Sequence, residues 1–486
     1  MNVLRSAGLV VMILLASACS TPGPAPVMLP QLPPAYPQAE DGAPAAQRWW
    51  EALRDPVLDQ LIDTAQRNNH DVRLALARVA QARAVLPAVD SRSAPNLALG
   101  GALSDQRSGL PPQVKFGLPD TRAAQLNVNL AWELDLMGAA AAASAAARAD
   151  LVQGEWAVRG AQMMVANEVA RQYLQLQAID RGAALAAAIV TTFDLTARLL
   201  EARQREGSAS RLDMERLLSA RAAAQARLPD FTADRSTVLD RINLLLGQAP
   251  GAALPLPAAV PVPPFDPYDP QALLLPGSGL LADPGKPPVG QPADLLLRRP
   301  DLQAAASAVT AGLARRRQAH AERYPRLFLA ALFGGERLTL NSIPYSPARY
   351  SNAALAFSAP LLDGGRLQAL EDLQAARVDE AGLAFEQSAL RAVQEVDSSL
   401  AQLKGQRERC LALLEARDRA LAALDRIRIL QREGEADALG VLDLVRTAFL
   451  AQAAVLDAER DRGLAAVRLY AALGGGWPDT TPEESR

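Results

Sequence analysis

Gln204-Arg205-Glu206-Gly207 recurs later in the chain as Gln431-Arg432-Glu433-Gly434, at an offset of 227 residues (434 − 207). Two further pairs of glycines keep the same offset: Gly138 with Gly365, and Gly247 with Gly474. Three landmarks in register without a net gap indicate an internal duplication. The two copies are therefore interpreted together, as two versions of one folding unit.

The segments between the first and second glycine of each copy are predicted to be helical. Residues 139–206 and 366–433 contain no proline and few glycines, and they are rich in Ala, Leu, Arg, Gln and Glu. At about 1.5 Å per residue each helix would be roughly 100 Å long, far beyond a globular core. Helices of this length need neighbours to pack on. A returning helix is predicted after each tetrapeptide, over 212–228 and 441–473.

Alternating sequence before each long helix predicts a pair of β-strands. In 125–136 Leu, Val and Trp residues alternate with polar or charged ones, apart from Ala131. Twelve residues of period two are typical of a membrane strand with a wet inner face, since strands of soluble sheets are about half as long. The other three predicted strands are 95–104, 327–340 and 352–361. Tyr345 and Tyr350, in the last connecting loop, are expected at a membrane interface.

Four strands cannot close a barrel, and an open sheet edge is not permitted in hydrocarbon. Other chains must supply the missing strands, and closed symmetry allows a dimer with eight strands or a trimer with twelve. The residues themselves leave that choice open. The predicted fold class is an α+β membrane protein with four barrel strands per chain, long helices and an internal two-fold repeat.

The N-terminus predicts export and a lipid anchor. Residues 1–18 form a secretion signal, with Arg5 as the positive charge and an apolar stretch, 7–15, too short to span a bilayer. The residues up to Cys19 resemble a bacterial lipobox in which that cysteine is lipidated, although Ala16 stands where leucine is usual. Ser20 fits sorting to the outer membrane. The alternative is an ordinary signal followed by a chance cysteine.

Composition supplies the remaining boundaries. A Pro/Ala-rich tether follows the signal, a helix is predicted over 49–86, and a second Pro-rich stretch separates the repeats. The predicted divisions are signal 1–18, lipidated tether 19–47, first repeat 48–247, linker 248–299, second repeat 300–474 and tail 475–486.

Five segments of the chain resemble the signatures of the TolC-like outer-membrane efflux factors, in the NodT-type lipoprotein branch. They are Trp49-Trp50 with Asp55-Pro56; Leu134-Asp135-Leu136-Met137-Gly138; Leu295 to Asp301, which includes Arg298-Arg299-Pro300; Pro360 to Arg366; and Leu469 to Trp477. The Arg-Arg-Pro-Asp and Leu-Gly-Gly-Gly-Trp segments are the most specific to that branch. The resemblance covers nearly the whole mature chain.

This resemblance implies a homotrimer with a twelve-stranded barrel in outer-membrane lipid, continued by a long helical tunnel through the periplasm. It implies docking to a periplasmic adaptor and an inner-membrane, proton-driven transporter, so that the chain is the exit duct of a tripartite pump for drugs or other small molecules. Gly138, Gly364 and Gly365 would form the barrel-to-tunnel turns. The family's aromatic and basic residues beside the first turn are replaced by Met137 and Ala139.

The resemblance also implies a periplasmic gate at the tip turns, where Gly207 and Gly434 end the long helices. Family aspartates just beyond these turns form a ring that holds the tip closed and favours cations. By motif these are Asp213 and Asp443, while Gly440 stands where a further aspartate is often found. The gate's usual tyrosine and arginine partners correspond to Gln431 and Ala436. Asp213 has an alternative role, because Ser210 three residues earlier can form a capping box with it.

No motif in the chain predicts catalysis, so an enzyme is not expected. The chain has no nucleophile elbow, phosphate-binding loop or Cys/His metal spacing, and its two histidines, His70 and His320, are expected to be solvated. We expect no cofactor or metal beyond the covalent lipid, and a net charge of −3 gives no reason to expect nucleic acid. Two alternatives remain: the same duct serving type I protein secretion, or a coiled-coil lipoprotein spacer without a pore.

Lipidation makes a direct prediction about the mature N-terminus. Mass spectrometry of the purified protein should find an acylated Cys19 as the first residue. Cys19→Ser should leave an unlipidated precursor that still inserts, because the strands provide a second hold on the membrane. An unmodified mature N-terminus beyond Ser20 would contradict the assignment.

Overall fold

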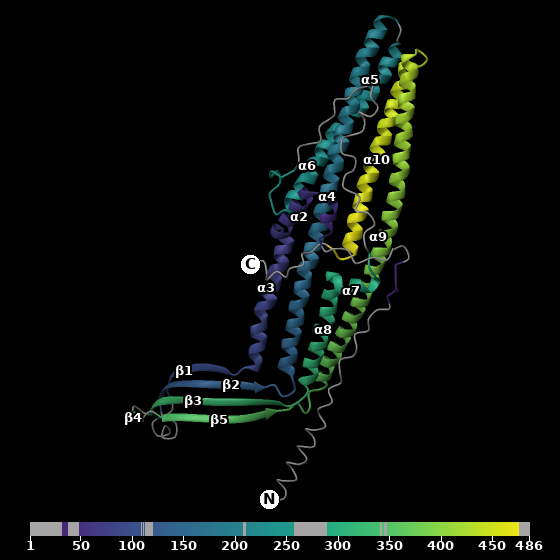
Figure 1. The fold of residues 1–486 in the computed structure, drawn as a ribbon. Coiled ribbons are helices and arrows are strands. Elements are labelled where there is room, and N and C mark those ends of the chain that lie inside the picture. Colours follow the sequence, from purple (N-terminus) through teal and green to yellow (C-terminus); the bar gives the residue numbers. More distant parts are fainter. Residues whose placement is uncertain are drawn as a thin grey trace. The chain divides into compact units, whose positions relative to one another are not determined.

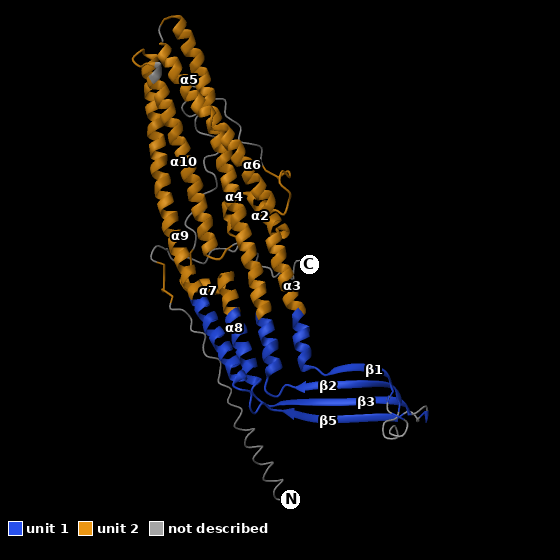
Figure 2. Cartoon of the chain, turned by 180° about the vertical axis from the view of Figure 1, so that it is seen from behind, with its two compact units in different colours: residues 1–30, 85–149, 308–386 blue, residues 31–84, 150–307, 387–486 orange. Residues whose placement is uncertain are grey.

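The structure is a computed structural model that describes residues 32–36, 48–107, 109, 111, 120–207, 210–256, 289–340, 343–344 and 348–475. The chain divides into two compact units, drawn in different colours in Figure 2. The first, here called the strand unit, contains 85–149 and 308–386; the second, the helix unit, contains 31–84, 150–307 and 387–486. Each unit includes residues from both repeats. Of the predicted signal and tether, only residues 32–36 belong to the described part of the chain.

The two long helices, α4 and α9 in Figure 1, begin and end at corresponding positions of the two repeats. Helix α4 spans Ala139–Arg205 and α9 spans Arg366–Arg432, 67 residues each, as the duplication predicts. All six landmark glycines have positive φ, between 71° and 83°. Glycine enters this left-handed conformation without the steric cost that other residues meet, and it commonly follows the end of a helix. Both repeats therefore keep the glycines at which the helices begin and end.

Helix α4 is apolar enough to be mistaken for a membrane span. It contains an 18-residue window of mean hydropathy 1.5 with at most two charged residues. One such helix is weak evidence for a span, because core helices of soluble proteins have the same composition. Alanine contributes much of the apolar character of α4, and small residues suit close helix packing as well as they suit lipid.

The N-terminal segment differs from the single helix predicted over 49–86. Asp55 interrupts it by capping a new helix, since its Oδ1 accepts from the backbone nitrogens of Val57 and Leu58, 3.0 and 3.2 Å away. Asn69 caps the next one in the same way, through the nitrogens of Asp71 and Val72. The three resulting helices are η2 (Trp49–Leu53), α2 (Pro56–Asn68) and α3 (His70–Asp90).

The helices after the tip turns differ between the repeats. Pro229 lies in the first turn of a new helix in repeat 1, where proline is tolerated but cannot continue the helix before it. The returning segment is therefore α5 (Arg211–Gln225) followed by α6 (Leu228–Leu245), whereas repeat 2 has one helix, α10 (Ala438–Ala472). The remaining helices are η3 (Ser91–Ser93), η6 (Pro292–Asp294), α7 (Leu295–Arg298) and α8 (Pro300–Ala321).

One antiparallel sheet contains all the described strands, and its four long strands confirm the prediction. They are β1 (Asn96–Gln106), β2 (Thr121–Leu134), β3 (Arg326–Leu340) and β5 (Ala348–Ser358), in the order β1-β2-β3-β5, with a short β4 (Ile343–Pro344) on β3. Pairing of β2 with β3 joins the two repeats. The predicted bounds of β2 and β5 were too late in the chain, because residues 121–124 and 348–351 also pair with β3.

The register confirms the predicted alternation and assembles one apolar face. Its members are Leu97, Leu99 and Leu103 in β1; Leu126, Val128, Leu130, Trp132 and Leu134 in β2; Leu327, Leu329, Ala331 and Phe333 in β3; and Ala353, Leu355 and Phe357 in β5. Gln125, Asn127, Asn129 and Glu133 lie on the opposite, polar face, where Gln125 donates to Glu336 at 2.9 Å. Phe328 and Leu332 of β3 share that face, so β3 alternates less cleanly.

Tyr350 does not lie in a loop as predicted. It belongs to β5 and pairs with Gly334, and a Cβ on that glycine would lie 2.8 Å from the tyrosine hydroxyl. The ring therefore covers the glycine on the polar face, as aromatic residues often do beside strand glycines. Tyr345 lies outside the described residues.

Two groups of contacts in the helix unit join the beginnings of the repeats to the end of the second repeat. The rings of Trp49 and Tyr470 stack with their centroids 4.9 Å apart. Arg299, from the Arg-Arg-Pro-Asp segment, is buried and bonds Asp301, Glu395 and the carbonyl oxygen of Ala472. The branch-specific motif thus supplies a guanidinium that ties α8, α9 and α10 together.

Two of the left-handed glycines provide a matched pair for mutation. Gly207→Ala adds only backbone strain, because nothing lies within 4 Å of the new Cβ. Gly247→Ala adds the same strain and places its Cβ 2.5 Å from the carbonyl oxygen of Asn68. We expect a loss of about 1–2 kcal/mol for the first and at least about 1 kcal/mol more for the second.

The midpoint of thermal unfolding in detergent, followed by circular dichroism at 222 nm, measures the difference. Wild type should unfold last and Gly247→Ala first. Equal midpoints for the two variants would show that the close approach of the Asn68 carbonyl oxygen does not destabilise Gly247→Ala.

Candidate functional site

The tip turns are the first part of the candidate site. At the second turn the nitrogen of Glu435 donates to the carbonyl oxygen of Leu430 at 2.8 Å, and the nitrogen of Gly434 donates to Gln431 at 3.2 Å. This is the pattern by which a left-handed glycine closes a helix. No atom lies within 4 Å of a Cβ built on Gly207 or Gly434, so the backbone conformation, rather than crowding, requires glycine here.

Asp213 forms the capping box that its spacing allows. Its nitrogen donates to Ser210 Oγ at 3.1 Å, and its carboxylate accepts from the nitrogen of Ser210 at 3.2 Å. Its carboxylate thus has a local structural role at the start of α5.

Asp443 lies in the second turn of α10, whose cap is Asp437. Its side chain is 65% exposed and pairs with Arg446, one turn further along, at 3.0 Å. The carboxylate of Asp443 is therefore exposed to solvent, and the guanidinium of Arg446 lies beside it. Arg446 was missed at the sequence level, although the spacing of three between opposite charges on a helix is a recognisable signal.

Gly440 has a packing reason to be glycine. A Cβ there would lie 2.9 Å from Cδ1 of Ile427 on α9 and 3.1 Å from Oδ1 of Asp437. A larger residue at this position would require the tips of these two side chains to move.

A cavity of about 750 Å³ gathers charges beside Asp443. Glu215 and Arg216 of α5 and Arg446 of α10 line it together with Asp443, whereas Asp213 does not. The structure thus brings Asp443 together with three charged residues that sequence reasoning did not select. The arrangement can hold small ions through exposed side chains of both signs.

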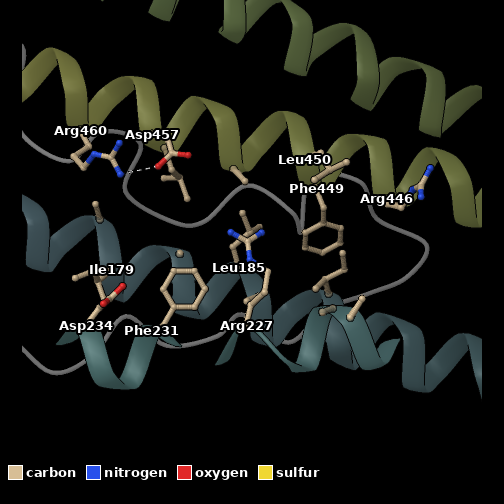
Figure 3. A pocket seen from close by; sticks show the side chains of 18 of the residues that line it. Ile179, Leu185, Arg227, Phe231, Asp234, Arg446, Phe449, Leu450, Asp457 and Arg460 are labelled. Atoms are coloured by element: carbon tan, nitrogen blue, oxygen red, sulfur yellow. Dashed lines mark hydrogen bonds and ion pairs between the residues drawn. The ribbon is translucent and has the colours of Figure 1, made fainter. Parts of the chain in front are cut away.

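A second cavity, of about 480 Å³, lies within the helix unit and is seen from close by in Figure 3. Its walls are mostly apolar and come from α4, α5, α6 and α10, and Figure 3 shows Phe231 and Phe449 entering it from opposite sides. Arg227, at the break between α5 and α6, stacks over Phe231 at 5.9 Å from the ring centroid. Asp457 and Arg460 pair at 2.9 Å in its wall. Residues at the break between α5 and α6, where Pro229 lies in the first turn of a new helix, thus line the cavity.

The barrel-to-tunnel turns share a capping device in the strand unit. Asp135 accepts from the nitrogen of Ala141 at 2.8 Å, and Asp363 accepts from the nitrogens of Leu367 and Gly365 at 2.9 and 3.0 Å. These backbone hydrogen bonds, that of Leu367 first, lower the pKa of Asp363 below its ordinary value. Gly138, Gly364 and Gly365 all have positive φ beside them. The aspartates of the two family motifs therefore start α4 and α9.

The histidines differ from expectation in one case. His70 is exposed, but His320 is half-buried and bonds Glu371 at 3.1 Å, so the prediction of a solvated side chain was wrong for it. Burial disfavours the charged form of Glu371, yet hydrogen bonds from Arg323 and His320 outweigh it and lower the pKa of this carboxyl. Within the described ranges no three His, Cys, Asp or Glu side chains are grouped as a metal site. Cys19 lies outside those ranges.

Comparison with known proteins agrees with this geometry. The family model described as outer membrane efflux protein matches residues 61–248 and 292–475, one segment in each repeat. A pyoverdine export outer membrane protein, OpmQ of Pseudomonas putida, is 30% identical and aligns over 96% of each chain. Outer membrane protein OprJ of Pseudomonas aeruginosa is 28% identical, over 92% of each chain.

Solved structures give the same result. The outer-membrane channel OprN superposes with a TM-score of 0.79 at 26% identity, covering 93% of this chain and 98% of that one. The transmembrane channel CusC, at 24% identity, has the same fold, with a TM-score of 0.77 over 92% and 97% of the two chains. The family model covers both repeats, and the four long strands and two helical hairpins of the structure agree with it. This chain belongs to the outer membrane efflux protein family.

Proposed function

We propose that three copies of this chain form the outer-membrane exit duct of a tripartite efflux pump. The observation that carries the proposal is the four-stranded sheet. Among the described residues, β1 pairs only with β2, and β5 only with β3 and at one side, so each chain has two strand edges to be completed. Three chains give twelve strands, an even number within the range of membrane barrels.

The relatives support the pathway. OpmQ is named for pyoverdine export, and the SrpC protein of Pseudomonas putida is named as part of a solvent efflux pump. We propose that this chain likewise passes small molecules from a periplasmic adaptor and an inner-membrane, proton-driven transporter, and that it is anchored by lipid on Cys19. Selection of the cargo would lie with the transporter.

Cross-linking between edge strands tests the ring. In a Cys410→Ala background, Ala98→Cys on β1 with Ala354→Cys on β5 should give covalent dimers and trimers with a bifunctional thiol reagent of about 10 Å span. The controls are Ala98→Cys alone and Ala354→Cys alone: each carries one half of the pair and should remain monomeric on denaturing gels. A ladder that stops at dimers would contradict the trimer.

The same edge variant, left uncross-linked, tests efflux. Expressed with adaptor and transporter in cells without another duct, it should lower accumulation of a fluorescent dye several-fold relative to the transporter and adaptor alone. Unchanged dye accumulation together with export of a polypeptide substrate would instead support the type I secretion alternative.

The exposed charge pair of α10 predicts how the tip selects ions. In a three-fold ring Asp443 and Arg446 each occur three times, and charges about 4 Å apart interact by about 1 kcal/mol even in water. Asp443→Asn should lower the ratio of potassium to chloride permeability by roughly 2- to 5-fold. Arg446→Gln should raise it, because the aspartate loses its partner.

Reversal potentials in planar bilayers under a KCl gradient measure that ratio. Asp213→Asn is the matched control, and it should change selectivity little because its carboxylate already serves the capping box. An unaltered ratio in both Asp443→Asn and Arg446→Gln would remove this pair from the gate.

A further inference from the structure

The apolar face of the sheet carries different kinds of residue at its two ends. Successive rows of paired residues run from Leu134 to Leu126 in β2 and cover about 27 Å along the strand. With the tilt of barrel strands, this is close to the height of the apolar band of a membrane barrel. At the end that connects to α3, α4, α8 and α9, the face carries only Leu134, Leu327 and Phe357.

At the opposite end the same face becomes basic. Arg349 of β5 pairs with Gly335, Arg337 of β3 pairs with Ala124, and Arg122 of β2 pairs with Asp105, each on the parity of the apolar residues. The three arginines come from three neighbouring strands, drawn side by side in Figure 1. Each lies two residue pairs further out than the last, in the order Arg349, Arg337, Arg122. We call Arg122, Arg337 and Arg349 the basic rim. All three side chains are exposed.

The basic rim carries an excess of positive charge. Asp105 is the one carboxylate on this parity of the described strands, and it bonds Arg122 at 3.2 Å and Arg107 at 3.3 Å. Arg107 and Arg122 thus share Asp105, the one carboxylate that the register places on this face of the strands. Within the described part of the chain, no carboxylate pairs with Arg337 or Arg349; the nearby Glu336 lies on the polar face and bonds Gln125.

Position and chemistry together identify the ligand. Arginine is unfavourable on the lipid face at the membrane midplane but tolerated at its edge. The rim lies at the end of the apolar rows, where that edge is expected. Its planar, forked donors suit phosphate groups better than any other anion-binding side chain does. In an outer-membrane efflux protein the helices are periplasmic, so the rim meets the outer leaflet, where phosphate groups are carried mainly by glycolipid.

We propose that the basic rim binds the phosphate groups of an outer-leaflet phosphorylated glycolipid, with the acyl chains of that lipid against the apolar face. The site takes an anionic amphiphile on the outside of the barrel and is separate from the conducting path. It would brace the outer ends of β2, β3 and β5, and it accounts for positive charge at only one end of the face.

The test uses purified, delipidated full-length protein in neutral detergent. The midpoint of thermal unfolding, followed by intrinsic fluorescence, is measured with a bisphosphorylated hexaacyl glycolipid and with its dephosphorylated form. Phosphatidylglycerol at equal concentration is the third arm. We expect the midpoint to rise with the bisphosphorylated glycolipid only, and the rise to shrink in high salt.

The triple variant Arg122→Gln/Arg337→Gln/Arg349→Gln should bind the glycolipid at least tenfold more weakly. Arg326→Gln is the control, since that arginine lies on the polar face of β3 beside Glu133 and should keep the wild-type shift. If the triple variant fails to assemble, Arg337→Gln and Arg349→Gln are compared singly. Equal stabilisation of wild type by the phosphorylated and dephosphorylated glycolipids, or by phosphatidylglycerol, would overturn the proposal, as would an undiminished shift in the variants.

Discussion

Backbone hydrogen bonding in hydrocarbon is the constraint on which the rest of this structure depends. A strand in a membrane must pair along both edges, because lipid offers no substitute partner. All fourteen residues of β2 pair with β3, so the sheet is continuous across the boundary between the two repeats. The outer edges of β1 and β5 can be completed only by further chains. Oligomerisation of the proposed duct is therefore a consequence of the number of strands in one chain.

Helix termination is the second organising feature. Two uninterrupted helices of 67 residues need definite ends, and left-handed glycines provide them at both ends of the repeat. Aspartates complete the arrangement: Asp135 and Asp363 start the long helices, Asp437 starts α10, and Asp213 forms the capping box with Ser210 at the start of α5. Several motif residues of the family thus serve local capping. Their role in the duct is to fix where the chain turns.

The duplication is not exact in three dimensions, and its departures are functional candidates. Pro229 divides the returning helix of repeat 1, whereas α10 runs unbroken through the corresponding part of repeat 2. The break contributes Arg227 and Phe231 to the cavity against α4 and α10, and the ring of Phe231 approaches within 2.8 Å of a Cβ built on Gly182. Gly440 similarly lets α10 approach Ile427 of α9. Gly182 and Gly440 thus permit close packing that differs between the two repeats.

The sequence by itself determined the repeat, the two long helices, the four strands and the family. These follow from periodicity and from glycines at fixed offsets, which are local properties of the chain. Tertiary structure decided what depends on partners distant in sequence. The bounds of β2 and β5 depend on the length of β3, and Tyr350 joins a strand because Gly334 leaves room for its ring. His320 bonds Glu371, 51 residues away. The basic rim also depends on register, because Arg122, Arg337 and Arg349 become neighbours only when three strands pair.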